Sequence, residues 1–172
     1  MSTPFDATAS MLGYLFQCRL ALVDSIPRLR YQGSFKVSIE TLEDVVFETS
    51  GQPLELLQTK HHAGTSSGLG DSSADLWKTL RIWSEGLREG RWPDDTIHYL
   101  ATTATAQPGS VAWMLRKQAR DPQRARDRLN QVARTSTNQE NQALYAAYLK
   151  LSQEERLSLL QRVVVLDRMP TI

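Results

Sequence analysis

The chain has 172 residues, of which 41% are hydrophobic and 23% are charged, and its formal net charge is +1. This length and composition are those of one globular domain with its own core, and the low charge argues against a strongly basic nucleic-acid-binding protein. No run of eighteen apolar residues is present, so we expect no membrane span, and residues 1–6 lack the features of a secretory signal peptide. The single cysteine, Cys18, cannot form an internal disulfide, which favours the reducing cytoplasm.

The first predicted element is a helix from about Ala9 to Ile26. Its apolar residues recur with helical spacing: Met11, Leu12, Leu15, Phe16, Leu20, Leu22 and Val23. Pro27 should end the helix, because a proline disfavours the helical conformation in the residue before it. Gln17 lies among the apolar residues, and a buried glutamine needs hydrogen-bond partners for its amide. We expect Gln17 to make either a structural hydrogen bond or a direct contribution to a site.

A β-hairpin forms the centre of the sequence. Residues 34–39 alternate well enough for a strand, and two further short strands lie within 39–48 and 54–60. A turn at Ser50-Gly51-Gln52-Pro53 joins these last two strands. The sequence therefore predicts one strand followed by a two-stranded hairpin.

Three chemically distinct side chains converge at one end of the predicted hairpin. Gln58 and Lys60 point the same way, because side chains alternate between the two faces of a strand. Folding the chain around Gly51 places Asp44 opposite Gln58, and cross-strand neighbours lie about 5 Å apart. A carboxylate, an amide oxygen and an ammonium group thus form a cradle suited to a divalent cation and a phosphate.

This arrangement fits the hydrolysis of a phosphodiester. Mg²⁺ prefers hard oxygen ligands and takes only one or two carboxylates from a protein, so Asp44 and Gln58 are its candidate ligands. Lys60 is suited to stabilise a phosphate or to position the attacking water. Glu40 or Glu43 is the candidate for a second carboxylate. Spacing alone does not distinguish this site from an edge hairpin in which a terminal lysine prevents strand pairing.

The remainder of the chain alternates helices with strands. A glycine- and serine-rich loop precedes a helix from about Ala74 to Arg88, whose apolar face includes Trp77 and Trp83 as core residues. A β-branched, apolar strand at 96–103 suits an interior position in the sheet. The sequence then predicts a helical C-terminal part and a final strand: helices at about 111–120, 122–134, 139–149 and 154–160, and a strand at 163–166.

Basic residues concentrate between Trp113 and Arg134, where seven basic residues accompany two acidic ones. A helical face of this kind either follows DNA phosphates or is simply solvated. The candidate phosphate contacts on it are Arg116, Lys117, Arg120 and Arg124. His61 directly follows Lys60 and is either a further phosphate contact or a solvated loop residue.

Four segments together carry a resemblance to a known family: Gly13-Tyr14-Leu15-Phe16-Gln17, Ile39-Glu40-Thr41-Leu42-Glu43-Asp44-Val45, Leu54-Glu55-Leu56-Leu57-Gln58-Thr59-Lys60-His61 and Leu76-Trp77-Lys78-Thr79-Leu80. In this order they resemble the PD-(D/E)xK, restriction-endonuclease-like superfamily, in the branch where glutamine replaces the second acid. Within that branch the chain is similar to the nuclease domain of CD-NTase-associated endonucleases from bacterial anti-phage operons. The likeness covers most of residues 5–104, and a helical extension over about 108–172 is compatible with it.

The resemblance implies a restriction-endonuclease-like α/β fold with a small central mixed sheet flanked by helices. It implies a hydrolase that cleaves double-stranded DNA with Mg²⁺, or with Mn²⁺ as a substitute, in antiviral defence. The catalytic residues that it implies are Asp44, Gln58 and Lys60, with Glu40, Glu43 and Gln17 as further candidates. Cutting both strands needs two active sites, so we expect a homo-oligomer.

The resemblance also implies that residues 1–172 are a single nuclease domain at the N-terminus of a longer protein. The fused part would be a cyclic-oligonucleotide sensor or a STAND-type ATPase. The alternative is a non-catalytic nucleic-acid-binding or oligomerisation module on the same fold. The presence of Asp44, Gln58 and Lys60 together favours the enzyme, because a decayed site is expected to lose one of them.

Overall fold

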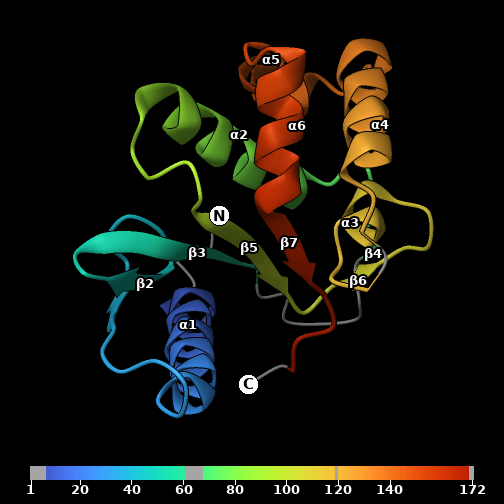
Figure 1. Ribbon diagram of the computed structural model, residues 1–172. Coiled ribbons are helices and arrows are strands. Elements are labelled where there is room, and N and C mark those ends of the chain that lie inside the picture. Colours follow the sequence, from blue (N-terminus) through green and yellow to red (C-terminus); the bar gives the residue numbers. More distant parts are fainter. Residues whose placement is uncertain (1–6, 61–67, 119, 171–172) are drawn as a thin grey trace.

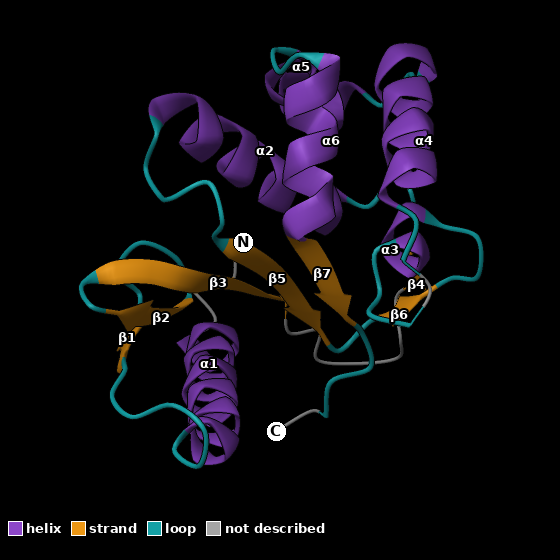
Figure 2. Cartoon of the chain, viewed as in Figure 1, coloured by secondary structure: helices purple, strands orange, loops and turns teal. Residues whose placement is uncertain are grey.

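The computed structural model describes residues 7–60, 68–118 and 120–170, which form a mixed α/β structure (Figure 1). Helices and strands alternate along the chain, with a group of helices in the C-terminal third (Figure 2). The elements are α1 (Ala7–Arg28), β1 (Lys36–Ile39), β2 (Val45–Thr49), β3 (Gln52–Lys60), β4 (Gly68–Leu69), α2 (Ala74–Glu89), β5 (Ile97–Thr102), β6 (Thr105–Ala106), α3 (Val111–Met114), α4 (Pro122–Thr135), the 3₁₀ helix η1 (Gln139–Asn141), α5 (Gln142–Leu149), α6 (Gln153–Arg162) and β7 (Val163–Leu166).

The main sheet has five strands in the order β1-β2-β3-β5-β7. β1, β2 and β3 form an antiparallel meander in which β2 and β3 are the predicted hairpin, whereas β3, β5 and β7 are mutually parallel. The interior position predicted for the strand at 96–103 is confirmed, because β5 pairs with β3 on one side and β7 on the other. β4 and β6 form a separate two-stranded parallel sheet.

Helices cover both faces of the main sheet, which explains why its central strands are apolar on both sides. Val45, Phe47 and Leu57 face α1, where they pack with Leu20 and Ala21. On the opposite face, the strands pack against α2 and the C-terminal helices (Figure 1). Trp77 and Trp83 are completely buried in this core, as predicted. The C-terminal helices and β7 share this core with β2, β3 and β5.

Two predicted helix ends are wrong. α1 continues through Pro27 to Arg28, because a proline removes only its own backbone donor and the Leu29 amide still bonds to the Ser25 carbonyl at 3.1 Å. The helix expected over 111–120 ends at Met114 instead. There the Leu115 carbonyl accepts a hydrogen bond of 3.0 Å from the Val165 amide, so the chain leaves the helix to pair with β7.

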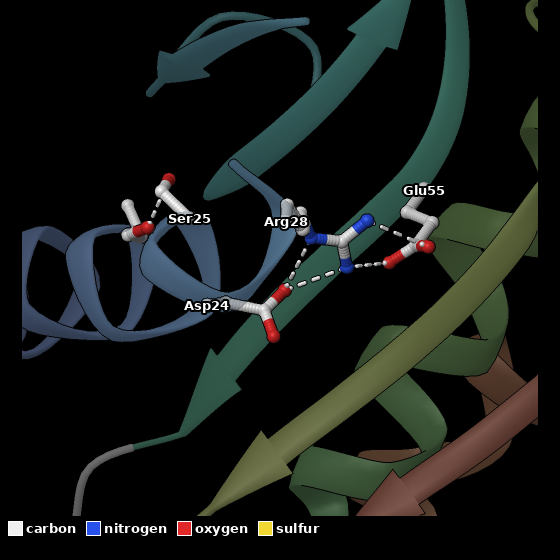
Figure 3. Close-up of polar contacts among 5 residues, drawn as sticks. Asp24, Ser25, Arg28 and Glu55 are labelled. Atoms are coloured by element: carbon white, nitrogen blue, oxygen red, sulfur yellow. Dashed lines mark hydrogen bonds and ion pairs between the residues drawn. The ribbon is translucent and has the colours of Figure 1, made fainter. Parts of the chain in front are cut away.

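Arg28 fastens the end of α1 to β3 (Figure 3). Its guanidinium donates two hydrogen bonds to the Glu55 carboxylate, at 3.0 and 2.5 Å, and two to Asp24, at 3.2 and 2.7 Å. The guanidinium carbon also lies 4.2 Å from the centre of the Phe47 ring. Burial alone would lower the pKa of Arg28, but the hydrogen bonds and charges of Glu55 and Asp24 outweigh it and raise that pKa. Arg28 therefore stays charged in a largely buried position.

Replacing this arginine should destabilise the fold much more than removing an exposed ion pair. Arg28→Met leaves the buried Glu55 carboxylate without its cation, and we expect a loss of about 3 kcal/mol in the free energy of unfolding. The matched control is Arg81→Met, which removes an exposed pair with Glu85 at 3.9 Å and should cost less than about 0.5 kcal/mol. Urea denaturation of the three proteins checks this, and equal losses for the two variants would contradict it.

Candidate functional site

The candidate residues gather where β2 begins and β3 ends. Val45 pairs with Leu57 in the β2–β3 ladder, so the residues just before and just after them, Asp44 and Gln58, face each other. The Gln58 side-chain nitrogen donates to an Asp44 carboxylate oxygen at 3.3 Å. The predicted opposition of Asp44 and Gln58 is therefore confirmed.

Asp44 is held by a residue that spacing did not reveal. One of its carboxylate oxygens, Oδ2, accepts hydrogen bonds from the backbone amide and from the hydroxyl of Thr59, both at 2.7 Å. One of these two hydrogen bonds comes from the backbone amide of Thr59, and a sequence pattern cannot predict a backbone donor. The two bonds orient the carboxylate and leave its second oxygen, Oδ1, directed toward Gln58.

The amide of Gln58 links three charged side chains. Its nitrogen donates to Glu43 Oε2 as well as to Asp44, and its oxygen accepts from the Lys60 ammonium at 3.3 Å. Gln58 and Glu43 are each only 5% exposed, so these contacts lie in a largely dry environment. The structure thus brings together Glu43, Asp44, Gln58 and Lys60, all of which were candidates from the sequence.

Gln17 and Glu40 form a second, neighbouring pair. The Gln17 side chain, 7% exposed on α1, donates to Glu40 Oε1 at 2.7 Å. Glu40 has a φ of 56°, in the left-handed region that a side chain rarely adopts, and its amide bonds to the Asp44 carbonyl at 3.1 Å. This strained turn places Glu43, not Glu40, against Gln58, and so selects between the two candidate second carboxylates.

Burial makes Glu43 unusual among the acids of the site. It raises the pKa of Glu43 to about 7; the negative charge of Asp44 adds to this increase, while the hydrogen bond from Gln58 and the charge of Lys60 oppose it. The second carboxylate oxygen, Glu43 Oε1, is buried and has no hydrogen-bond partner among the described residues. A buried, unpaired carboxylate oxygen is a group that a cation or a proton would stabilise.

The donor set fits a hard divalent cation. Glu43 Oε1, Asp44 Oδ1 and Gln58 Oε1 are three oxygens of the kind that Mg²⁺ prefers, two from carboxylates and one from an amide. Gln58 would have to turn its amide over, because its nitrogen now faces the two carboxylates. No cluster of three histidine, cysteine, aspartate or glutamate ligands occurs among the described residues. A site with three protein ligands at this place therefore needs the amide oxygen of Gln58 in addition to the two carboxylates.

The four basic residues predicted to follow DNA phosphates do not share one helix, because α3 ends before them. Arg120 donates to the backbone carbonyls of Leu160, Gln161 and Val163 at the end of α6, so its side chain is occupied structurally. Arg116 lies over the Trp113 ring at 5.0 Å and 4.0 Å from Asp167. Arg116, Lys117 and Arg120, which we expected on a helix over 111–120, therefore lie outside the described helices, and of the four only Arg124 is helical, in α4.

The other two basic residues lie apart, in different pockets. Lys117 lines a pocket of about 290 Å³ with Asp24 and Tyr99 on the α1 side of the sheet, and Arg124 lines another beside α4. His61 lies outside the described residues. Among the described residues, no hydrogen bond or ion pair connects Arg116, Lys117, Arg120 or Arg124 to the cluster around Gln58.

No protein-family model matches the chain, and a search of curated proteins finds no significant match. None of the described helices combines the length and apolarity needed to cross a membrane.

The raised pKa of Glu43 predicts a distinctive pH dependence of stability in buffer with EDTA. The folded protein retains a proton on Glu43 that the unfolded chain releases at its lower pKa, so stability should fall as pH rises from about 4.5 to about 7. Glu43→Gln removes this effect, and we expect the stability of the wild type relative to the variant to fall by about 3 kcal/mol across the window. Chemical denaturation at several pH values measures it, and parallel pH curves would contradict the assignment.

Proposed function

We propose that this chain is a metal-dependent endonuclease that hydrolyses phosphodiester bonds of double-stranded DNA, as an effector domain of anti-phage defence. The observation that carries the proposal is the hydrogen-bonded cluster of the buried Glu43 and Gln58 with the partly buried Asp44, and with Lys60 at its edge. Two carboxylates, an amide and an ammonium group meet there, with one carboxylate oxygen unpaired. These are the groups that phosphodiester hydrolysis requires.

Glu43, Asp44 and Gln58 would hold Mg²⁺, or Mn²⁺ in its place. The cation supplies Lewis acidity, which polarises a phosphoryl oxygen and lowers the pKa of water. Thr59 keeps Asp44 in the ligating orientation through its two hydrogen bonds of 2.7 Å. Turning the Gln58 amide over directs its oxygen toward the two carboxylates and releases Lys60 from its present acceptor.

Lys60 then binds the scissile phosphate. Its ammonium is a compact charge on a half-buried side chain at the end of β3, 3.3 Å from the Gln58 oxygen. A cation fixed at this place stabilises the negative charge that develops on the phosphate as the bond breaks. Arg116, Lys117, Arg124 and His61 remain proposed contacts to more distant phosphates, whereas Arg120 is left out because α6 occupies its guanidinium.

The proposal also covers the oligomeric state of the enzyme, its location and the domain fused to it. Cleavage of both DNA strands needs two active sites, which favours a homo-oligomer in the cytoplasm. A fused sensor or ATPase domain would control it in the full-length protein.

One observation favours the alternative, a non-catalytic nucleic-acid-binding or oligomerisation module. The Gln58 nitrogen already donates to one oxygen of each carboxylate, so hydrogen bonds hold most of the cluster together and leave only Glu43 Oε1 unpaired. A binding module would keep this network unchanged and would hold DNA equally well in EDTA. The two experiments below separate these functions.

The first experiment measures cleavage of supercoiled plasmid with Mg²⁺ or with EDTA. We expect cleavage only with Mg²⁺, and a loss of at least about 100-fold in Lys60→Ala, because a charge that stabilises the transition state is removed. The matched control is Lys36→Ala, which removes an exposed lysine of β1 that pairs with Glu48 at 2.9 Å and should leave the rate unchanged.

Three outcomes would count against the proposed site or activity. Cleavage that survives in Lys60→Ala places the active site elsewhere, as does an equal loss in Lys36→Ala. Plasmid that stays intact with the wild type, even when a fused coiled coil forces dimerisation, supports the binding module instead.

The second experiment measures the effect of Mg²⁺ on thermal stability, without any DNA. A cation that binds only the folded protein stabilises it by about 2.7 kcal/mol at 100 times its dissociation constant. We expect Mg²⁺ to raise the melting temperature of the wild type and of the control Asp95→Asn, whose carboxylate is exposed. Asp44→Asn should abolish the rise, and an equal rise in both variants would contradict the proposed ligands.

A further inference from the structure

The outward side of α1 exposes a group of large apolar side chains. Of the nine large hydrophobic residues that are most exposed among the described residues, eight lie on α1 or in the turn after it, and the ninth is Leu42. We call these eight the α1 face: Met11, Tyr14, Leu15, Leu22, Val23, Ile26, Leu29 and Tyr31, which are between 44% and 86% exposed. Soluble monomers rarely leave so large an apolar patch in contact with water.

Most of these residues are spaced so that they lie along one side of the helix. Met11, Leu15, Leu22, Ile26 and Leu29 recur at helical intervals and form one stripe. The opposite side of the helix is buried against the sheet through residues such as Phe16 and Leu20. α1 thus has two apolar sides, of which only one is covered by the described chain (Figure 1).

The area of the α1 face is close to what a stable dimer needs. A large side chain offers about 150–200 Å² of surface, so eight that are roughly half exposed present on the order of 700 Å². A standard protein interface buries about 800 Å² on each partner. Two copies of this face pressed together would therefore reach the size of a specific interface.

The sequence of α1 is also complementary to itself. The midpoint of Ala7–Arg28 lies between residues 17 and 18. If two such helices run antiparallel with Cys18 opposite Cys18, large residues at the ends of the face meet small ones, with Met11 beside Ser25 and Ile26 beside Ser10. Nearer the axis, Leu22 meets Tyr14, which is a contact between two large apolar side chains. Pairing of large with small residues lets facing helices interdigitate.

We propose that the α1 face binds the α1 face of a second copy of this chain, with the two helices antiparallel about a two-fold axis at Cys18. A two-fold axis makes the same surface serve both partners, as a self-complementary stripe requires. This proposal does not depend on the proposed nuclease activity, and its tests measure association alone.

The first test is the molar mass in solution, measured by light scattering over a range of concentrations. The wild type should be a dimer, and Leu22→Asp should raise the dissociation constant for self-association at least about 100-fold, because the two-fold axis buries the charge twice. Leu42→Asp is the matched control, since Leu42 is also about half exposed but lies off α1, and it should stay dimeric. Circular dichroism confirms that each variant is folded.

The second test uses the only cysteine of the chain. Mild oxidation of the wild type should link two copies through Cys18, and this covalent dimer should be greatly reduced in Leu22→Asp. A monomeric wild type would overturn the proposal. So would a dimer that resists Leu22→Asp, a dimer that forms no Cys18 disulfide, or a monomer that binds anionic lipid vesicles through the α1 face.

Discussion

The site depends on how Thr59 holds Asp44. Two hydrogen bonds of 2.7 Å from one residue of β3 fix the carboxylate that stands just before β2, and with it the register of the hairpin. A slip of one residue would turn Gln58 and Lys60 to the opposite face of the sheet. Because β3 is also paired to β5 over its last six residues, the register is fixed from both sides. The candidate chemistry therefore rests on a rigid part of the fold.

α1 contacts residues near the candidate site on one side and is exposed on the other. Arg28 fixes the helix to Glu55 on β3, and Gln17 reaches from the same helix to Glu40, in the turn that leads to Asp44. The other side of the helix is the exposed α1 face. One element thus supports the turn beside the proposed active site and offers the surface on which we infer that a second copy binds.

Local pattern was enough to predict part of this arrangement. Alternation along the strands and the turn at Gly51 predicted that Asp44 opposes Gln58, and β-branched content predicted the interior place of β5. The predictions that were wrong concern residues whose structure depends on contacts with distant parts of the sequence. The helix after Val111 is cut short by β7, about fifty residues later, and Arg120 is occupied by carbonyls more than forty positions away on average. The choice of Glu43 over Glu40 follows from the left-handed backbone of Glu40, which spacing does not reveal.

A crystal structure of the protein with Mn²⁺, in which anomalous scattering locates the cation, tests the proposed metal site most directly. We expect a single strong peak about 2.0–2.2 Å from oxygens of Glu43, Asp44 and Gln58, the usual ligand distance for a small hard cation, with the Gln58 amide turned over. A Gln58 nitrogen that still donates to Glu43, with no metal beside Asp44, would contradict the proposed metal site.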